Sequence, residues 1–254
     1  MGFYDLSKEE RNQLVQKIQS NLLNDLQKGQ DENFIKYFSD KDTYIRKSGY
    51  LAIGKLYRTE KVPISAIILQ LNKLMQSKRE KVRQTAVNAA GELGKTDFDT
   101  VVHFFDTGLF DEHHSVRNAV IGSIKKMGEK NPKPVLAWAK KYLHHPDKEV
   151  RREICHGIEL RGRKHPEDIL PLLKELEHDK TARVKNTLIH VLGQIAYKKG
   201  CLATVVEALN KWENKELVEK ALDEIVDVHE RYKNFATLTQ AQAMVYIDHN
   251  FIRK

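Results

Sequence analysis

A chain of 254 residues is long enough to bury a sizeable core in one or two domains. Hydrophobic residues make up 41% and charged residues 31%, a balance typical of globular rather than disordered proteins. No stretch reaches the roughly 18 apolar residues of a membrane span, and the first residues match neither a signal peptide nor a myristoylation site. The two cysteines, Cys155 and Cys201, form no CxxC pair. We therefore expect a cytoplasmic monomer without a disulfide framework.

The net charge of +8 is concentrated in the middle of the chain. Residues 51–200 hold 28 Lys and Arg against 18 Asp and Glu, while the remaining residues are slightly acidic. A basic middle is expected if this part of the chain faces a polyanion, although ordinary solubility charge explains the excess equally well.

The first predicted element is a capping helix within residues 1–30. Ser7 and Glu10 have the spacing of a capping box, in which each side chain bonds the other's backbone amide. Leu14, Ile18 and Leu22 then recur at helical spacing on one face.

Residues 31–230 contain a repeat in which an apolar anchor precedes a cation. It recurs at intervals of 33 to 37 residues, as Ile45-Arg46, Val82-Arg83, Val116-Arg117, Val150-Arg151, Val184-Lys185 and a degenerate copy at Leu217. Apolar or small residues four and eight positions after each anchor define one helix face. We predict that six such helices, the second helices of the repeats, begin near residues 43, 80, 114, 148, 182 and 215.

A second amphipathic run precedes each anchor. These runs are the predicted first helices, at 64–75, 98–110, 134–143, 169–176 and 202–212, and prolines mark several of their starts. Each helix pair cannot bury its apolar stripe alone, so stacking the pairs makes the core. A final helix at 237–252 caps the array, with 231–237 the best linker. The sequence thus predicts one domain over 1–254, a right-handed all-α solenoid of about six helical repeats.

The repeat resembles HEAT repeats. A spacing of 34 residues also suits tetratricopeptide arrays, but the Trp, Gly-Tyr and Ala-Phe-Pro positions of that family do not recur here in register. An aspartate five residues before the anchor, at Asp40, Asp111 and Asp179, together with the following Val-Arg pair, is typical of HEAT repeats instead.

Catalytic signatures are scarce. The sequence has no P-loop, no HExxH and no GxSxG. The adjacent pairs His113-His114 and His144-His145 lack a neighbouring Cys or carboxylate to complete a ligand set, so we predict no metal and no cofactor. Cys155 follows a core position and is expected to be structural rather than nucleophilic.

The cations that follow the anchors form a ladder, which has two interpretations. In a right-handed solenoid the second helices line the concave face, where a stripe of cations follows a phosphate backbone. Alternatively, each cation pairs with turn aspartates of its own or the next repeat. In the fourth repeat, Arg152, Arg161, Arg163 and Lys164 lack matching turn acids and favour a ligand. The predicted DNA-binding residues are Arg46, Lys47, Arg83, Arg117, Arg151, Arg152 and Lys185.

Residues 144 to about 212 resemble the HEAT-like-repeat DNA glycosylases of the AlkC/AlkD type, which excise alkylated bases. The matching text is His145-Pro146-x3-Val150-Arg151-Arg152-x4-Gly157, then Leu170-Pro171-Leu172-Leu173-x2-Leu176-x2-Asp179-x4-Val184. The resemblance implies that Arg152 holds DNA phosphate. It also implies an acid that stabilises the sugar cation, but His156 and Gln194 stand where the family's acids are expected.

Three functions are compatible with these patterns. The first is binding of duplex DNA by a basic concave face, with weak or absent catalysis. The second is a non-enzymatic scaffold for a protein partner. The third is an active alkylpurine DNA glycosylase that uses Glu92, Glu153 or Asp223. Among the aromatic residues, Trp138 and Trp212 are expected in the core, while Tyr50 or Tyr57 is expected to face the groove.

Overall fold

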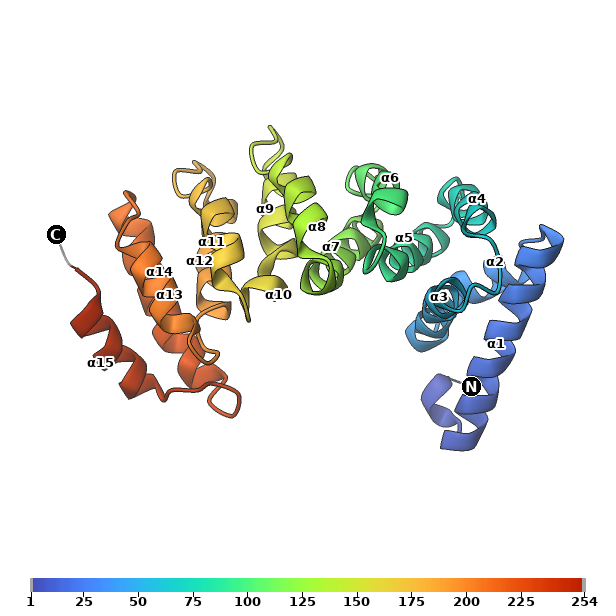
Figure 1. The fold of residues 1–254 in the computed structure, drawn as a ribbon, viewed down its shortest axis with the longest axis horizontal. Helices are drawn as coiled ribbons and strands as arrows, with labels where there is room; N and C mark the ends of the chain where they lie inside the picture. The colour runs from blue at the N-terminus through green and yellow to red at the C-terminus, as the bar shows by residue number, and fades with distance from the viewer. Residues whose placement is uncertain (1, 253–254) are drawn as a thin grey trace. The chain divides into compact units, whose positions relative to one another are not determined.

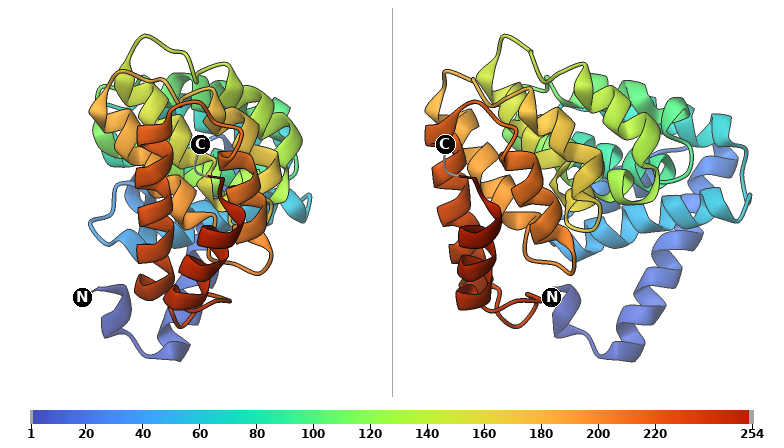
Figure 2. Two further views of the ribbon diagram at one scale, coloured as in Figure 1. Left: turned by 90° about the vertical axis from the view of Figure 1, so that its left-hand side faces the viewer. Right: turned by 60° about the vertical axis from the view of Figure 1, so that its left-hand side comes forward.

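The computed structural model describes residues 2–252, and all regular structure within that range is helical (Figures 1 and 2). The contacts between helices divide the chain into two compact units, which meet in the sequence at Asn131 and Pro132. Each unit is described by itself, and the single domain over 1–254 stays a prediction. No helix in the described range is long and apolar enough to cross a membrane.

Unit 1 begins with a capping helix and continues with three helix pairs. Ser7 accepts a hydrogen bond from the Glu10 amide at 3.2 Å, and the Glu10 carboxylate accepts one from the Ser7 amide at 2.8 Å, which confirms the predicted capping box. The second helices α3, α5 and α7 pack side by side, and α1 packs on α3. The helices are α1 (Lys8–Lys28), α2 (Glu32–Phe38), α3 (Thr43–Arg58), α4 (Ile64–Met75), α5 (Glu80–Gly94), α6 (Phe98–Gly108) and α7 (His114–Lys130).

Unit 2 contains three further pairs and a terminal helix. Here α9, α12 and α14 are the stacked second helices, while α11, α13 and α15 pack in sequence in the other layer. The helices are α8 (Pro132–Lys140), α9 (Lys148–Gly157), α10 (Glu159–Gly162), α11 (Pro166–Lys174), α12 (Ala182–Gln194), α13 (Cys201–Leu209), α14 (Lys215–Arg231) and α15 (Gln240–Asn250).

The six second helices begin at the predicted residues because their start signals are local. Asp42 accepts a hydrogen bond from the Tyr44 amide at 2.7 Å, and Asp147 accepts one from the Glu149 amide at 2.8 Å, so each caps its helix. The second helix of the fourth repeat is interrupted at one residue. It ends at Gly157 and resumes as α10 at Glu159, while Ile158 between them keeps right-handed helical dihedrals and its amide bonds the Ile154 carbonyl at 3.2 Å.

The core is formed by the apolar faces that the anchors define. Val82, Val116 and Val184 are fully buried, and Trp138 and Trp212 are each 2% exposed, which confirms their assignment to the core. Cys155 is also buried, and burial raises the pKa of its thiol far above the ordinary value, so it cannot supply a thiolate.

Candidate functional site

Two arginines of the ladder form ion pairs with aspartates of the same chain. Arg83 donates to both carboxylate oxygens of Asp111 at 2.7 and 2.9 Å, and Arg151 donates to Asp179 at 2.6 and 3.3 Å. Each aspartate lies 28 residues further along the chain, in the turn of the next repeat. Burial alone would raise the pKa of Asp111, but hydrogen bonds from Arg83 and from a backbone amide lower it below its usual range.

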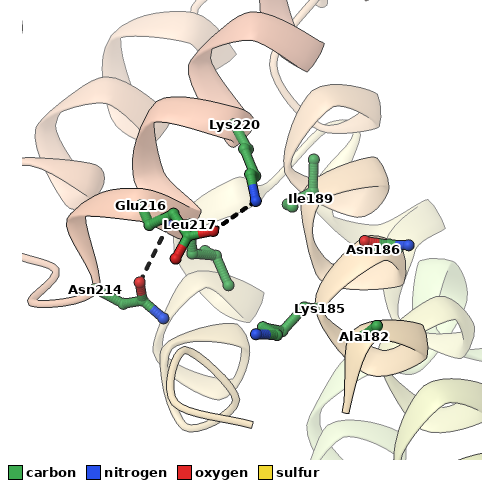
Figure 3. A pocket seen from close by; sticks show the side chains of 8 residues that line it. All are labelled: Ala182, Lys185, Asn186, Ile189, Asn214, Glu216, Leu217 and Lys220. Carbon is green, nitrogen blue, oxygen red and sulfur yellow. Dashed lines mark hydrogen bonds and ion pairs between the residues drawn. The ribbon is translucent and has the colours of Figure 1, made fainter. Parts of the chain in front are cut away.

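The other ladder residues differ in their surroundings. Arg46 donates to the Asp40 carbonyl at 2.6 Å and Arg117 donates to the Asp111 carbonyl at 2.7 Å, so both hold the turn before their own helix. Lys185 instead extends from α12 into a hollow of about 130 Å³ beside the start of α14, near Glu216 (Figure 3). Of the two interpretations of the ladder, pairing with the turns therefore describes its arginines.

The arginines of the fourth repeat are not left unpaired for a ligand, because Arg152, Arg161 and Arg163 each have an acidic partner. Arg161 pairs with Asp168 at 2.6 Å and Arg163 donates to Glu159 at 3.0 Å through Nε. The sequence offers no turn acids for them, but acids on the adjoining helices take that place.

Four other cations gather at the second helices of unit 1, together with a tyrosine and a glutamate. We call these six residues the lysine cluster: Lys47, Tyr50, Arg58, Glu92, Lys95 and Lys126. The ammonium group of Lys126 on α7 lies 5.3 Å from the ring centroid of Tyr50 on α3. The ammonium group of Lys95 lies 2.5 Å from a carboxylate oxygen of Glu92, which is 4% exposed. Three successive repeats thus contribute to one patch.

The close packing of α3 against α5 depends on Gly54. A Cβ atom at this position would lie 2.6 Å from the Cβ of Glu92 and 3.2 Å from Nη1 of Arg58. Any larger residue would push Glu92 away. The glycine therefore lets the Glu92 side chain and the Arg58 guanidinium both lie close to the backbone of α3 at this position.

The charges of the cluster act on one another. Partial burial lowers the pKa of Lys126, the nearby charges of Lys95 and Lys47 lower it further, and Glu92 opposes this effect. Burial and the charge of Glu92 raise the pKa of Tyr50. Four cations share one carboxylate among these six side chains, so the patch is set up to attract an anion.

Unit 2 has a polar pocket of about 320 Å³ between the exposed faces of α9 and α12, which we call the histidine pocket. Glu149 lies at its edge and pairs with Arg152 at 3.0 Å and with Arg183 at 3.1 Å. The pocket is lined by Arg152, His156, Arg183, Asn186, Thr187 and His190.

The candidate catalytic acids lie in three separate places. Glu92 belongs to the lysine cluster, whereas Glu153 is buried and accepts a hydrogen bond from Nη2 of Arg152 at 3.3 Å. Asp223 is exposed on α14 and lines another hollow, of about 310 Å³, with Glu219 and Asp227. The structure therefore does not bring the three acids together.

The two positions where the family's acids were expected have clear structural surroundings. Nε2 of His156 lies 3.1 Å from the carboxylate of Glu159, and Gln194 is buried and accepts a hydrogen bond from Arg163 at 2.8 Å.

Sequence reasoning did not single out Lys126, Glu159 or His190. The signal in the sequence that could have identified the histidine pair is the position of each residue within its repeat. His156 and His190 both stand six residues after their anchors, at Val150 and Val184. Equivalent positions of adjacent repeats lie side by side in a solenoid, so comparing every position across repeats would have paired these histidines.

Comparisons with known proteins agree with this architecture. The family model for HEAT repeats matches residues 135–225. The chain is similar in structure to AlkD2 from Streptococcus mutans, with a TM-score of 0.54 and 17% identity over 82% of this chain and 97% of that one. It is also similar to smu.31 from Streptococcus mutans UA159, with a TM-score of 0.51 and 19% identity over 70% of this chain and 94% of that one. A search of curated proteins finds no match.

The class of protein follows from these findings. The chain is an all-α solenoid of HEAT-like repeats. Its fold resembles that of AlkD2, which agrees with the AlkC/AlkD-type resemblance of the sequence.

Proposed function

We propose that the chain binds duplex DNA through the lysine cluster of unit 1. The observation that carries this proposal is the convergence of Lys47, Arg58, Lys95 and Lys126 from three successive second helices. Their mutual repulsion and the partial burial of Lys126 are tolerated in the folded protein, as expected if a polyanion offsets them on binding. Tyr50 adds a partly buried ring on which a sugar or base can stack.

The proposal changes the predicted set of DNA contacts. Of the residues expected from the sequence, Lys47 is exposed and belongs to the cluster. Arg83 and Arg151 are held by Asp111 and Asp179, so breaking those pairs to bind phosphate would cost stability. Arg152 lies in the histidine pocket, where it remains a candidate second contact. The similarity of fold to AlkD2 supports a nucleic-acid ligand over a protein partner.

A fluorescence anisotropy titration with a labelled duplex at 50 mM salt tests the proposal. Wild type should bind with micromolar or tighter affinity, and affinity should fall by roughly 0.9 log units per log unit of salt for each phosphate contacted. The double variant Lys47→Glu/Lys126→Glu should bind at least tenfold more weakly.

The matched control reverses two lysines of the first helices in the same unit. Lys36→Glu/Lys73→Glu makes the same change in net charge on α2 and α4, where both side chains are exposed. This control should bind DNA within threefold of wild type. Equal losses in the two double variants would mean that net charge alone attracts DNA, and the cluster would not be the site.

The position of Glu92 favours a second activity, the weak release of alkylated purines. An alkylated purine carries positive charge, so its glycosidic bond needs little help beyond a carboxylate that stabilises the sugar cation. Glu92 is the one candidate acid within the lysine cluster, but it is 4% exposed and paired with Lys95, so we expect slow release. With methylated genomic DNA, Glu92→Gln should abolish release, while Glu153→Gln and Asp223→Asn should retain it. Loss in Glu153→Gln alone would move the chemistry to unit 2.

A further inference from the structure

Three side chains with potential metal-ligand atoms converge at the histidine pocket, where His156 and His190 line the hollow and Glu159 is buried beside His156. One ligand atom of each of His156, Glu159 and His190 lies within 4.8 Å of the other two. Nε2 of His156 is 3.1 Å from Oε2 of Glu159, and the rings of the two histidines meet edge to face with centroids 6.1 Å apart. The three groups come from α9, α10 and α12 of one compact unit.

Helical spacing brings His156 and Glu159 together. Ile158 between α9 and α10 keeps right-handed helical dihedrals, so Glu159 follows His156 by three residues along one helical path, and its side chain is 2% exposed. Arg163 donates to its other oxygen, Oε1, through Nε at 3.0 Å and also through Nη2. The arginine thus holds the carboxylate with Oε2 directed at His156, and Gln194 holds the arginine through a hydrogen bond of 2.8 Å.

His190 also has an acidic neighbour behind it. Its Nδ1 lies 3.6 Å from Oε1 of Glu224, which Arg231 holds at 3.1 Å. Carboxylates behind metal-binding histidines orient the ring and raise its basicity. Glu159 and His190 therefore have outer partners that fix their positions, as the ligands of built metal sites do.

We propose that His156, Glu159 and His190 bind a divalent transition-metal ion, for which Zn²⁺ is the best match. Two imidazoles and one carboxylate form a ligand set that zinc uses in sites with an open coordination position. Zinc bonds of about 2.0 to 2.2 Å require ligand atoms roughly 3.4 Å apart in a tetrahedral site. The His156–Glu159 pair already meets this spacing, and a modest rotation of His190 supplies the rest.

The surroundings suit a bound cation with an open position. The pocket of about 320 Å³ lies in front of both histidines and admits water to the ion. Arg152 lines the same pocket, but its charge is offset by Glu149 at 3.0 Å and Glu153 at 3.3 Å. The adjacent pairs His113-His114 and His144-His145 gave no metal site in the sequence, whereas this set joins His156 and Glu159 to His190, which lies 34 and 31 positions further along the chain.

Calorimetry with ZnCl₂ alone, on the full chain after removal of chelator, tests the proposal. Wild type should take up one equivalent of Zn²⁺ with micromolar or tighter affinity. His190→Gln should weaken that binding at least tenfold, and because His190 is half-exposed the variant should keep the wild-type circular dichroism spectrum. His156→Gln should behave in the same way.

The matched control is His144→Gln. His144 also pairs with a carboxylate, that of Glu175 at 2.9 Å, but no third ligand from this chain joins them in a metal-binding group among the described residues. The control should retain wild-type affinity. Replacing Zn²⁺ by Co²⁺ gives a second readout, since visible absorption bands of a bound Co²⁺ should be present in wild type and lost in His190→Gln. The proposal is overturned if wild type binds no stoichiometric ion, or if His144→Gln loses as much affinity as His190→Gln.

Discussion

The pair formed by Arg83 and Asp111 gives a sharp prediction about stability. The side chains are 10% and 9% exposed, and two hydrogen bonds join them across a repeat boundary. Asp111→Asn keeps the shape and the oxygen that accepts from the His113 amide, but it places an NH2 donor opposite Nε of Arg83, so it removes the charge and one hydrogen bond of the pair. Breaking a buried ion pair costs about 3 to 5 kcal/mol because the remaining charge is left without its partner.

We expect a loss of about 3 kcal/mol, at the lower end of that range, because Glu112 also contacts Arg83 at 3.3 Å and is exposed. The control is Asp31→Asn, which breaks the surface pair with Lys73, whose side chain is 59% exposed. Such pairs contribute about 0 to 1 kcal/mol.

Urea unfolding followed by circular dichroism at the helical band measures both variants, because Trp138 and Trp212 report only on unit 2. The double variant Arg83→Met/Asp111→Asn should be more stable than Asp111→Asn alone, since neither buried charge remains. If Asp111→Asn lowers the free energy of unfolding no more than Asp31→Asn does, the buried pair does not stabilise the repeat boundary and our reasoning is refuted.

Three further results are expected. The folded-state pKa values of Asp111 and Asp179 are lowered. Their contribution to the free energy of unfolding is therefore present above the unfolded value of about 3.9 and is lost as pH falls below it. Acid titrations of wild type should show this loss of stability, and variants lacking the partner arginines should show less of it. Gly54→Ala should destabilise by about 1 to 3 kcal/mol in urea because its Cβ overlaps a neighbouring helix, whereas Gly122→Ala has open space and should stabilise slightly. Lys126→Gln should raise Tm in calorimetry while weakening DNA binding, because its charge is disfavoured in the folded state.

The sequence predicted the architecture well because its signals are local. The anchors and the helical spacing act within one or two turns, so the starts of the second helices agreed with the structure. The aspartates five residues before an anchor were expected in the turn and at the N-cap, but the caps of α3 and α9 are Asp42 and Asp147. The break after Gly157 was not predicted. A glycine within a helical pattern is usually tolerated, and whether the helix continues depends on packing in the neighbouring repeat.

The site was predicted less completely, for a different physical reason. Lys47 and Glu92 were both singled out, but nothing local indicated that they share a patch with Lys126, which lies 34 residues beyond Glu92. The partners within reach of a long cationic side chain depend on how the helices pack, which the local sequence does not specify. The ladder arginines illustrate this, because all four hold the turn before their own helix, and Arg83 and Arg151 also reach an aspartate in the next turn.

Repeat register connects the structural and functional residues of this chain. The arginine directly after an anchor bonds the turn before its own helix, which explains why the ladder arginines serve the stack. Positions six, ten and thirteen residues after the anchor lie on the second-helix surface of at least two repeats, and there the chain carries His156 and His190, then Glu92 and Lys126, then Arg58 and Lys95. Each such pair comes from two repeats and meets only because the repeats stack. A net charge of +8 cannot distinguish these roles, because it counts a cation bonded to a turn and a cation facing solvent alike. The register position does distinguish them, because the proposed anion-binding and metal-binding groups stand at different positions after their anchors.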